Sequence, residues 1–472
     1  LNLPANMRRC KSVTRAEEIQ SVEAKVRKSQ PDQPCHSHKD SLFSWSSGFD
    51  NFSGLINLAF LLLSLVGVRL LLENLIKYGV LVNPVEWADA FETHPSYSSY
   101  YPSLYLIAFT NVEILLSYGV VLLASQSFIT DIVANIIHAT YLLGFLILPI
   151  ICIGLQKEAF ALIGATAVCF IYSLVFLKLW SYAHVNHWCS LEFRQKKRMK
   201  RQRSFTICAQ GKRISSPETE AVAVFVKYPD NITLRDLYYF MLAPTLCYEL
   251  NFPRSGRIRK RFLIRRLLEV VVGMNVVLAL IQQWIIPSVK NSLVPFSNMN
   301  IIRASERLLK LAVPNHLIWL ICFYLYFHAL LNLIGELLRF ADRDFYGDWW
   351  NAQNIDYFWR TWNLPVHRWA IRHLYKPLAQ SGYSKVFSTA AVFLLSAFMH
   401  EYLVSVPLNL FKVWAFTGMM FQLPLSVLSR YAERRFGGRF GNILMWASLI
   451  LGQPLCIMMY YHDVVIQNLS SG

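Results

Sequence analysis

A His and a Glu stand side by side in the middle of an apolar run. The stretch "STAAVFLLSAFMHEYLVSVPLNLF" (388–411) contains His400 and Glu401 at the centre of an expected membrane span over 386–410. An ionisable side chain at that depth costs about 2.5–3.5 kcal/mol on insertion scales. Because the ordinary pKa of imidazole lies close to neutral pH, a His in this position is a candidate for acid–base chemistry.

Two other imidazoles and one amide share this setting. His138 and His328 lie inside apolar runs, and Gln453 lies in the "LGQPLC" segment of the last run. A buried His can be a hydrogen-bonded core residue or a functional one, so the residues alone leave open which of the three carries chemistry. Adjacent residues on a helix point about 100° apart, which predicts that Glu401 bonds elsewhere and does not pair with His400.

Apolar helices must position these groups. Of the 472 residues, 54% are hydrophobic and only 16% are charged, against about a quarter charged in soluble proteins. The apolar residues fall into blocks of about twenty, the length that crosses bilayer hydrocarbon. We therefore predict an all-α polytopic membrane protein with about nine transmembrane helices, over 54–74, 103–124, 131–154, 158–180, 267–287, 314–338, 386–410, 413–429 and 442–461.

The basic residues predict how these spans are oriented. With a cytosolic N-terminus, roughly 36 Lys and Arg fall in cytosolic segments and about half a dozen in the opposite loops, as the positive-inside rule requires. Topology thus accounts for the net charge of +17, and no nucleic-acid partner is expected. Residues 1–50 are predicted to be a disordered basic cytosolic tail, 51–466 a membrane-embedded domain, and 467–472 a lumenal C-terminus.

Two cytosolic segments, 181–266 and 339–385, are too long to be simple connectors. The run "RQKKRMKRQR" (194–203) predicts a solvated loop that faces anionic headgroups. The stretch 236–261 mixes aromatic, apolar and Arg residues, which favours a segment at the membrane interface. Segment 339–385 has five Trp, three Phe and four Tyr, a composition that predicts an aromatic belt with short amphipathic surface helices.

Several other chemistries have no support. The nine Cys are scattered without CxxC or Cys/His spacing, so neither a disulfide framework nor a metal site is predicted. GxSxG, P-loop, HExxH and GxGxxG motifs are absent. A proton-coupled transporter or channel stays open, although no repeats or paired broken helices point to one. A scaffold for lipid-droplet or membrane proteins would leave the buried His without a role.

Two strings resemble one family. "FYGDWWN" (345–351) and "SAFMHEYLVSVPL" are similar to the membrane-bound O-acyltransferase family, in the branch that holds sterol and diacylglycerol acyltransferases. The strings "DNITLRDLYYFMLAPTLCYELNFPRSGRIRKRF", "ERLLKLAVPNHLIWLI", "TWNLPVHRWAIRHLYKP", "WAFTGMM" and "GQPLCIMMYYHD" extend the resemblance over most of the chain.

The resemblance implies a reaction and a location. In that reaction the acyl group of acyl-CoA passes to the free hydroxyl of 1,2-diacylglycerol, giving triacylglycerol and CoA. A sterol, retinol or a long-chain alcohol is the alternative acceptor. The resemblance further implies a multi-pass enzyme of the endoplasmic reticulum membrane that contacts membrane lipid and forms homodimers or homotetramers. No cofactor is expected, because acyl-CoA is a substrate.

The resemblance also assigns roles to residues. His400 matches the catalytic His of the family, which implies a general base on the glycerol hydroxyl. Asn363 and Gln453 match amides that would donate to the oxyanion, where one such bond is worth about 3–4 kcal/mol. The implied acyl-CoA-binding residues are Trp359, Arg360, Trp362, Asn363, His367, Tyr375, Lys385 and Ser396. Position 360 holds Arg where the family pattern has Gln, and both Arg360 and Lys385 suit a phosphate.

The FYGDWWN motif has two interpretations, direct chemistry or structural support at the mouth of the site. We favour structural support, for Phe345, Tyr346, Asp348, Trp349, Trp350 and Asn351 as well as for Glu401. CoA is cytosolic and diacylglycerol is dissolved in the bilayer. Both can reach His400 only if a tunnel opens to the cytosol and a lateral gate admits lipid, so polar groups at this depth are expected to line a cavity.

Overall fold

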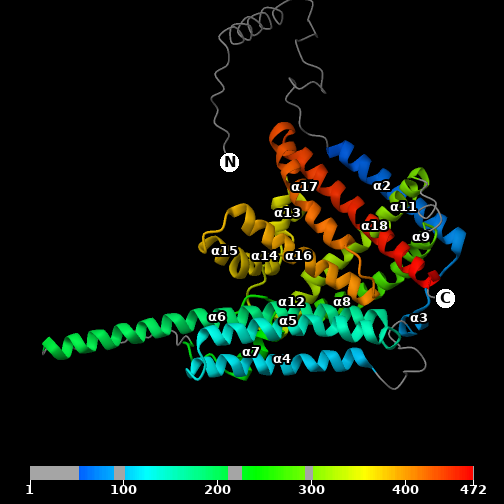
Figure 1. The fold of residues 1–472 in the computed structure, drawn as a ribbon. Helices are drawn as coiled ribbons and strands as arrows, with labels where there is room; N and C mark the ends of the chain where they lie inside the picture. Colours follow the sequence, from blue (N-terminus) through cyan, green and yellow to red (C-terminus); the bar gives the residue numbers. More distant parts are fainter. Residues whose placement is uncertain (1–52, 90–100, 211–225, 293–300, 471–472) are drawn as a thin grey trace, which may run out of the picture. The chain divides into compact units, whose positions relative to one another are not determined.

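The computed structural model of the protein is almost entirely helical (Figure 1). It describes residues 53–89, 101–210, 226–292 and 301–470. Within these ranges the β pairing consists of an isolated bridge between Arg254 and Phe340. The prediction of an all-α fold is therefore confirmed, whereas the predicted tail, 1–50, lies outside the described residues.

The chain divides into two compact units, residues 1–73 and residues 74–472. The described part of the first unit is the beginning of helix α2 (Ser53–Tyr78). Its side chains between Leu63 and Leu72 are mostly exposed and apolar, as expected for a helix that faces lipid. The second unit holds the end of α2 and every other described element.

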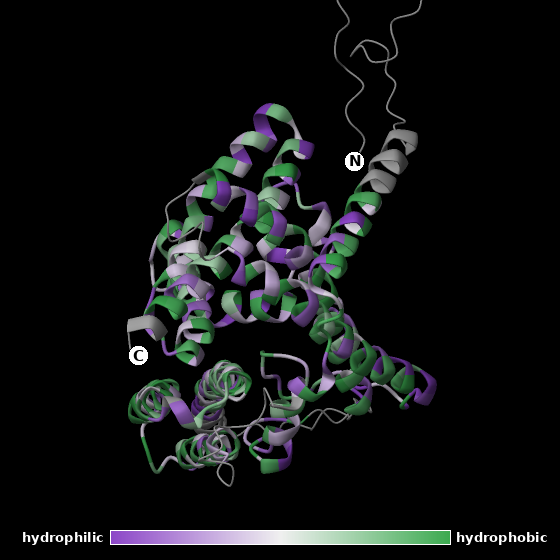
Figure 2. Ribbon diagram, turned by 90° about the vertical axis from the view of Figure 1, so that its right-hand side faces the viewer, coloured by the Kyte–Doolittle hydropathy of each residue, from purple (hydrophilic) through white to green (hydrophobic). Residues whose placement is uncertain are grey.

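The long helices of the second unit match the predicted spans. They are α4 (Pro102–Ser125), α5 (Asp131–Leu155), α6 (Leu162–Gln210), α8 (Lys260–Leu280), α11 (Ile301–Phe323), α16 (Lys385–Leu408), α17 (Trp414–Phe436) and α18 (Gly438–Ser470). The helices α4, α5 and α6 pack side by side, and α16 packs on α6 and α17. Many large apolar side chains of these helices are exposed, as contact with lipid requires, and Figure 2 shows apolar residues along much of the helices.

A criterion of length and apolar composition supports six of the nine predicted spans. Six helical stretches of the described chain are long and apolar enough to cross a membrane: Pro102–Ser125, Asp131–Leu155, Leu162–Met199, Ile302–Leu337, Lys385–Leu408 and Gly438–Gln467. The other three predicted spans are helical, in α2, α8 and α17, and are not among these six. The count of nine is thus not confirmed.

Short helices fill the connections. They are α3 (Pro84–Asp89), η3 (Lys157–Ala159), α7 (Leu234–Leu242), η4 (Ile281–Ile285), α9 (Ile286–Lys290), η5 (Tyr324–Leu330), α12 (Leu331–Leu337), η6 (Trp349–Asn351), α13 (Ile355–Thr361), α14 (Leu364–Ala370), η7 (Ile371–Tyr375) and α15 (Lys376–Gln380). Three of them, η4, η5 and η7, are π-helical turns inside longer helices. Such turns are frequent at functional sites, and η5 carries His328.

Helix α6 corrects one prediction. The basic run 194–203, predicted as a loop, is part of this helix, which continues beyond the neighbouring ends of α4 and α5 (Figure 1). Arg194 binds Asp131 of α5 at 2.8 Å, and Lys196 pairs with Glu192 one turn earlier at 2.5 Å. Pairs at this spacing stabilise a helix, and composition alone does not distinguish a charged helix from a charged loop.

The first part of the segment 236–261, predicted to lie at the interface, packs into the protein as far as residue 252, whereas residues 253–261 are mostly exposed. Phe240 is fully buried, and the ammonium of Lys178 on α6 donates to the carbonyl oxygens of Phe240, Met241 and Ala243 at 2.7–2.9 Å. Carbonyl groups at the end of a helix have no partner within it. Lys178 therefore ends α7 and fixes the turn that follows.

The segment 339–385 forms short helices as predicted, but most of its Trp residues do not form a belt. Trp349 and Trp369 are buried, Trp359 and Trp362 are partly buried, and Trp350 is exposed. Trp349, Trp359 and Trp362 share one cluster with residues of α11, α17 and α18. These three rings pack against other helices of the protein, so the Trp residues of this segment contribute in part to the protein core.

Candidate active site

His400 lies on α16 with its two ring nitrogens in different surroundings. Its Nδ1 is 2.7 Å from the carbonyl oxygen of Ser396, one turn earlier, and 3.5 Å from Ser396 Oγ. A carbonyl oxygen can only accept a hydrogen bond, so Nδ1 carries the proton and Nε2 carries the lone pair. Among the described residues none hydrogen-bonds to Nε2. This nitrogen is free to accept a proton.

The other two imidazoles considered from the sequence are bonded differently. His138 Nδ1 is 2.6 Å from the hydroxyl of Tyr141, and His328 Nδ1 is 2.8 Å from the hydroxyl of Tyr346. A phenol hydroxyl can donate or accept, so it does not hold either ring in one tautomer. Of these three rings, His400 is the one that its partner fixes in the form of a base.

Glu401 bonds to neighbouring helices, as its direction on the helix predicts. Its carboxylate accepts hydrogen bonds from the hydroxyl of Ser405, from the backbone N–H of Phe416 at 2.8 Å and from the hydroxyl of Tyr460 at 2.7 Å. The last two donors belong to α17 and α18. Glu401 therefore joins three helices next to His400.

The side-chain amide oxygens of Asn363 and Gln453 each accept a hydrogen bond. Asn363 Oδ1 accepts from the backbone N–H of Val366 at 3.2 Å and caps the N-terminus of α14. Gln453 Oε1 accepts from Asn315 Nδ2 of α11 at 3.2 Å. An amide whose oxygen is engaged in this way has its NH2 group left to donate. Each side chain can thus serve as an oxyanion donor.

The FYGDWWN motif holds the turn that carries Asn363. The backbone N–H of Gly347 donates to Thr361 O at 2.7 Å, and that of Leu364 donates to Phe345 O at 3.1 Å. These two bonds flank Asn363 on both sides. A Cβ at Gly347 would lie 3.3 Å from Thr361 Cβ, so the close approach of the two segments favours glycine.

The polar residues of the motif bond to nearby side chains, within the motif and outside it. The hydroxyl of Tyr357 donates to Asp348 at 2.7 Å, which lowers the pKa of that carboxyl. Asn351 Nδ2 lies 3.5 Å from the other oxygen of Asp348. Trp349 is buried in the core, whereas Trp350 is exposed. These contacts are structural in kind, and they support the interpretation favoured from the sequence.

Comparison with known proteins decides the family. The sequence model of the membrane-bound O-acyltransferase family matches residues 135–462, a range that contains His400, Asn363 and Gln453. The chain belongs to this family.

Similar proteins carry one name. The chain is 46% identical to diacylglycerol O-acyltransferase 1 of Bos taurus, over 93% of this chain and 86% of that protein. It is 47% identical to diacylglycerol O-acyltransferase 1 of Homo sapiens, over 92% and 85%. To diacylglycerol O-acyltransferase 1A of Glycine max it is 38% identical, over 92% and 83%.

In this O-acyltransferase the residues predicted to bind acyl-CoA lie on α16 and on the connection before it. Trp359 and Arg360 lie on α13, Trp362 and Asn363 follow it, His367 lies on α14, Tyr375 on η7, and Lys385 and Ser396 on α16. Burial, with Arg360 and Arg368 nearby, lowers the pKa of His367. Lys385 is exposed in the first turn of α16, about 22 Å along the helix axis from His400 by the helical rise.

One contact brings α13 to the face of α16 that bears His400. The rings of Trp359 and Phe393 are 6.2 Å apart. Phe393, Ser396 and His400 are spaced three and four residues apart, so they share one face of the helix. Trp359 therefore packs on the same side as the imidazole.

Sequence reasoning does not single out two polar residues of the acyltransferase, Asn315 and His316. Asn315 bonds to Gln453, and the ring of His316 packs on Trp319 and Trp446. The string "VPNH" places both residues in the same apolar run as His328. The pattern that makes His328 a candidate, a polar residue inside an apolar run, therefore applies to Asn315 and His316 as well.

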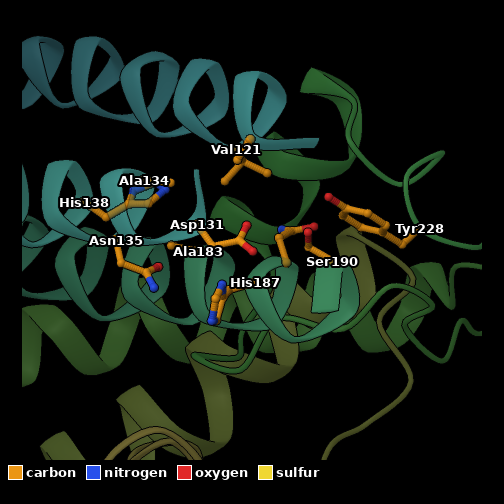
Figure 3. Close-up of a pocket in the computed structure, with 11 residues that line it drawn as sticks. Val121, Asp131, Ala134, Asn135, His138, Ala183, His187, Ser190 and Tyr228 are labelled. Atoms are coloured by element: carbon orange, nitrogen blue, oxygen red, sulfur yellow. The ribbon is translucent and has the colours of Figure 1, made fainter. Parts of the chain in front are cut away.

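A separate pocket lies between α4, α5, α6 and Tyr228 (Figure 3). His138 and His187 line it from α5 and α6, whereas His400, Asn363 and Gln453 do not. Among the described residues no cluster of three His, Cys, Asp or Glu could hold a metal ion.

Proposed function

We propose that this protein transfers the acyl group of acyl-CoA to the free hydroxyl of 1,2-diacylglycerol, giving triacylglycerol and CoA. Membership of the O-acyltransferase family supports the reaction type. Identities of 46–47% to proteins named diacylglycerol O-acyltransferase 1, over more than nine-tenths of the chain, support the acceptor. The structural observation that carries the mechanism is the bond from His400 Nδ1 to Ser396 O, which leaves Nε2 as a base.

The reaction needs one proton transfer and no covalent acyl-enzyme. His400 Nε2 takes the proton of the glycerol hydroxyl while that oxygen attacks the thioester carbonyl carbon. The C–S bond then breaks, and the CoA thiolate leaves with the proton that the imidazolium returns. A thiol with a pKa of about 8.5 is a good leaving group, so a strong general acid is unnecessary. The Ser396 carbonyl holds the ring in place and stabilises the imidazolium.

Asn363 and Gln453 supply the donors for the oxyanion. Their NH2 groups are free because Val366 and Asn315 engage the amide oxygens. In a site from which water is excluded, removal of one such donor costs about 2.7–4 kcal/mol of transition-state stabilisation. Glu401 and the FYGDWWN motif position these groups by joining the helices and the turn that carry them.

We also propose where the enzyme works and how it assembles. The excess of Lys and Arg in the segments assigned to the cytosol supports a cytosolic N-terminus and a lumenal C-terminus. That orientation delivers CoA to Arg360 and Lys385 from the cytosol. By resemblance to its family, the protein is a homodimer or homotetramer in the endoplasmic reticulum membrane, with no cofactor besides its substrates.

The test uses purified wild type and His400→Ala with labelled oleoyl-CoA. Diacylglycerol, cholesterol and retinol are supplied in turn, and the labelled products are separated. Wild type is expected to make triacylglycerol, and His400→Ala to make almost none. His138→Ala is the matched control and should keep its activity. Equal synthesis by His400→Ala would refute the general base, and cholesteryl or retinyl ester as the main product would refute the acceptor.

A further inference from the structure

His316 on α11 is a partly buried imidazole whose two ring nitrogens are buried and have no hydrogen-bonding partner among the described residues. Neither Nδ1 nor Nε2 bonds to any residue that the structure describes, although both atoms are shielded from solvent. An imidazole always has at least one N–H donor, and leaving it unbonded in a buried place costs stability. An unsatisfied polar group of this kind needs an explanation, and a ligand is one.

The surroundings of His316 hold further unsatisfied donors. Its ring stacks on Trp319 and meets the edge of Trp446, with centroid distances of 5.4 Å each. Trp319 in turn lies 5.3 Å from Trp349. The indole N–H groups of Trp349 and Trp359, in the same aromatic cluster, are also buried without a partner. Each unbonded donor in a purely structural core would cost stability, so several of them within one cluster indicate a ligand.

Two contacts connect the elements of this aromatic cluster with those of the proposed catalytic groups. Asn315, which precedes His316 on α11, holds the oxyanion donor Gln453 at 3.2 Å. Trp359 of the cluster packs on Phe393, which shares a face of α16 with His400.

The three polar groups lie in apolar stretches that are long enough to cross a membrane. His316, Gln453 and His400 belong to Ile302–Leu337, Gly438–Gln467 and Lys385–Leu408 respectively. In an apolar site of this kind the polar ligand atoms are those of the reacting thioester and of the acceptor. The amide groups of the CoA arm lie nearer the cytosol, because CoA enters from that side.

Diacylglycerol brings the group that matches an unsatisfied donor. Beside its hydroxyl it has two ester carbonyl oxygens, which accept hydrogen bonds and have no water to bond in the middle of a bilayer. We propose that His316 donates a hydrogen bond to an ester carbonyl oxygen of the acceptor and so sets the specificity of the enzyme for diacylglycerol. This assignment rests on the proposed function and names the recognition element of the same site.

The role of the bond is discrimination between acceptors. An acceptor with a hydroxyl but no ester carbonyl would leave His316 unbonded at the moment of reaction. Sites built to bond a polar group of the substrate reject analogues that lack it. One neutral bond of this type corresponds to about a tenfold preference.

The test compares two acceptors of the same shape. Purified full-length enzyme receives oleoyl-CoA with either 1,2-dioleoylglycerol or the diether 1,2-dioleylglycerol, which lacks both carbonyls. The kcat/KM ratio of ester to diether is measured for wild type, His316→Phe and His316→Gln. We expect a ratio of about ten or more in wild type, a ratio near one in His316→Phe, and recovery in His316→Gln, which retains a donor.

The matched control is His138→Phe, which removes another intramembrane imidazole and should leave the ratio unchanged. Equal use of both acceptors by wild type would overturn the assignment even if His316→Phe does not fold. So would an equal loss for both acceptors in His316→Phe, or a raised KM for oleoyl-CoA with the ratio unchanged. Failure of wild type to make triacylglycerol at all would overturn the proposed function, and this assignment with it.

Discussion

Two sets of buried polar groups in the second unit differ in their hydrogen bonding. At the end of α12, the carboxylate of Glu336 accepts the backbone N–H and the guanidinium of Arg259, at 2.6 and 2.8 Å, and the guanidinium of Arg343 at 3.1 Å. Glu401 is saturated in the same manner. Around His316, by contrast, several donors have no partner among the described residues.

The difference separates scaffold from site. A saturated buried carboxylate joins the elements that donate to it, and its removal leaves those donors unpaired. A donor that the fold leaves free is available to a ligand. Neighbouring residues illustrate the contrast, since His400 presents a free Nε2 while Glu401 is fully bonded. Loss of a free group should therefore reduce activity, and loss of a saturated group should reduce stability.

The largest expected effect is the loss of activity when His400, whose Nε2 has no partner among the described residues, is replaced. His400→Gln keeps a polar side chain of similar size but cannot accept a proton, so kcat should fall about 10³-fold, within the range typical of general-base catalysis. The KM for oleoyl-CoA and the melting temperature should stay close to wild type. Initial rates and thermal unfolding in detergent check both. A variant that retained a tenth of wild-type kcat would contradict the assignment.

The next largest effect is the loss of stability when Glu401, which is fully hydrogen-bonded, is replaced. Glu401→Ala leaves the Tyr460 hydroxyl and the Phe416 N–H without their acceptor, and the free energy of unfolding should fall by about 2–4 kcal/mol. The activity per folded molecule should fall much less than in His400→Gln. Glu306→Ala is the control, because Glu306 is exposed and pairs with Lys310 on the surface, so its loss should not change stability. A Glu401→Ala protein with wild-type stability and no activity would place Glu401 in the chemistry.

How much of this could be read from the sequence depends on the range of each interaction. In lipid the backbone must bond within its own segment, so apolar runs predict helices. The opposite directions of His400 and Glu401 follow from helix geometry for the same reason. The burial of 236–252 does not follow, because it depends on Lys178, and Lys178 is 62 residues from Phe240.

In the candidate site, too, the contacts between residues distant in the sequence could not be predicted. The bond that holds Gln453 comes from Asn315, a residue 138 positions away. The tautomer of His400 depends on a carbonyl one turn earlier, whereas His138 and His328 meet tyrosine hydroxyls. These partners are set by rotamers and packing, for which apolar periodicity carries no signal. The family motifs pointed to His400 and Gln453, but only the fold brings His316 to the aromatic cluster.

A smaller loss of activity is expected at Asn315, which holds the proposed oxyanion donor Gln453. Asn315→Ala removes the donor that holds Gln453 Oε1, so the amide can rotate and kcat should fall about tenfold while both KM values stay unchanged. Gln453→Ala should cost more, and adding Asn315→Ala to it should cost nothing further, because Asn315 acts through Gln453. Initial rates of the four proteins complete the cycle. Additive losses would show that Asn315 has a separate role.

The smallest effect is a pH dependence of stability from a saturated imidazole. His373 Nε2 is 2.8 Å from Ser181 Oγ, which itself accepts from Tyr248 N, and His373 Nδ1 is 3.2 Å from His184 Nδ1. Burial, with His184 and Arg372 nearby, lowers the pKa of His373 to about 3.

In the unfolded chain His373 binds a proton near pH 6.5, and in the folded protein it does not. The contribution of neutral His373 to the free energy of unfolding is therefore complete above pH 6.5 and is lost as the pH falls toward 3. Between pH 6.5 and 5.5 the free energy of unfolding should fall by about 1 kcal/mol from this group. Thermal unfolding of wild type and His373→Gln at both pH values measures it. The difference between the two pH values should be smaller in the variant, because Gln does not titrate. An identical difference in both proteins would mean that His373 is protonated as readily in the folded state as in the unfolded chain.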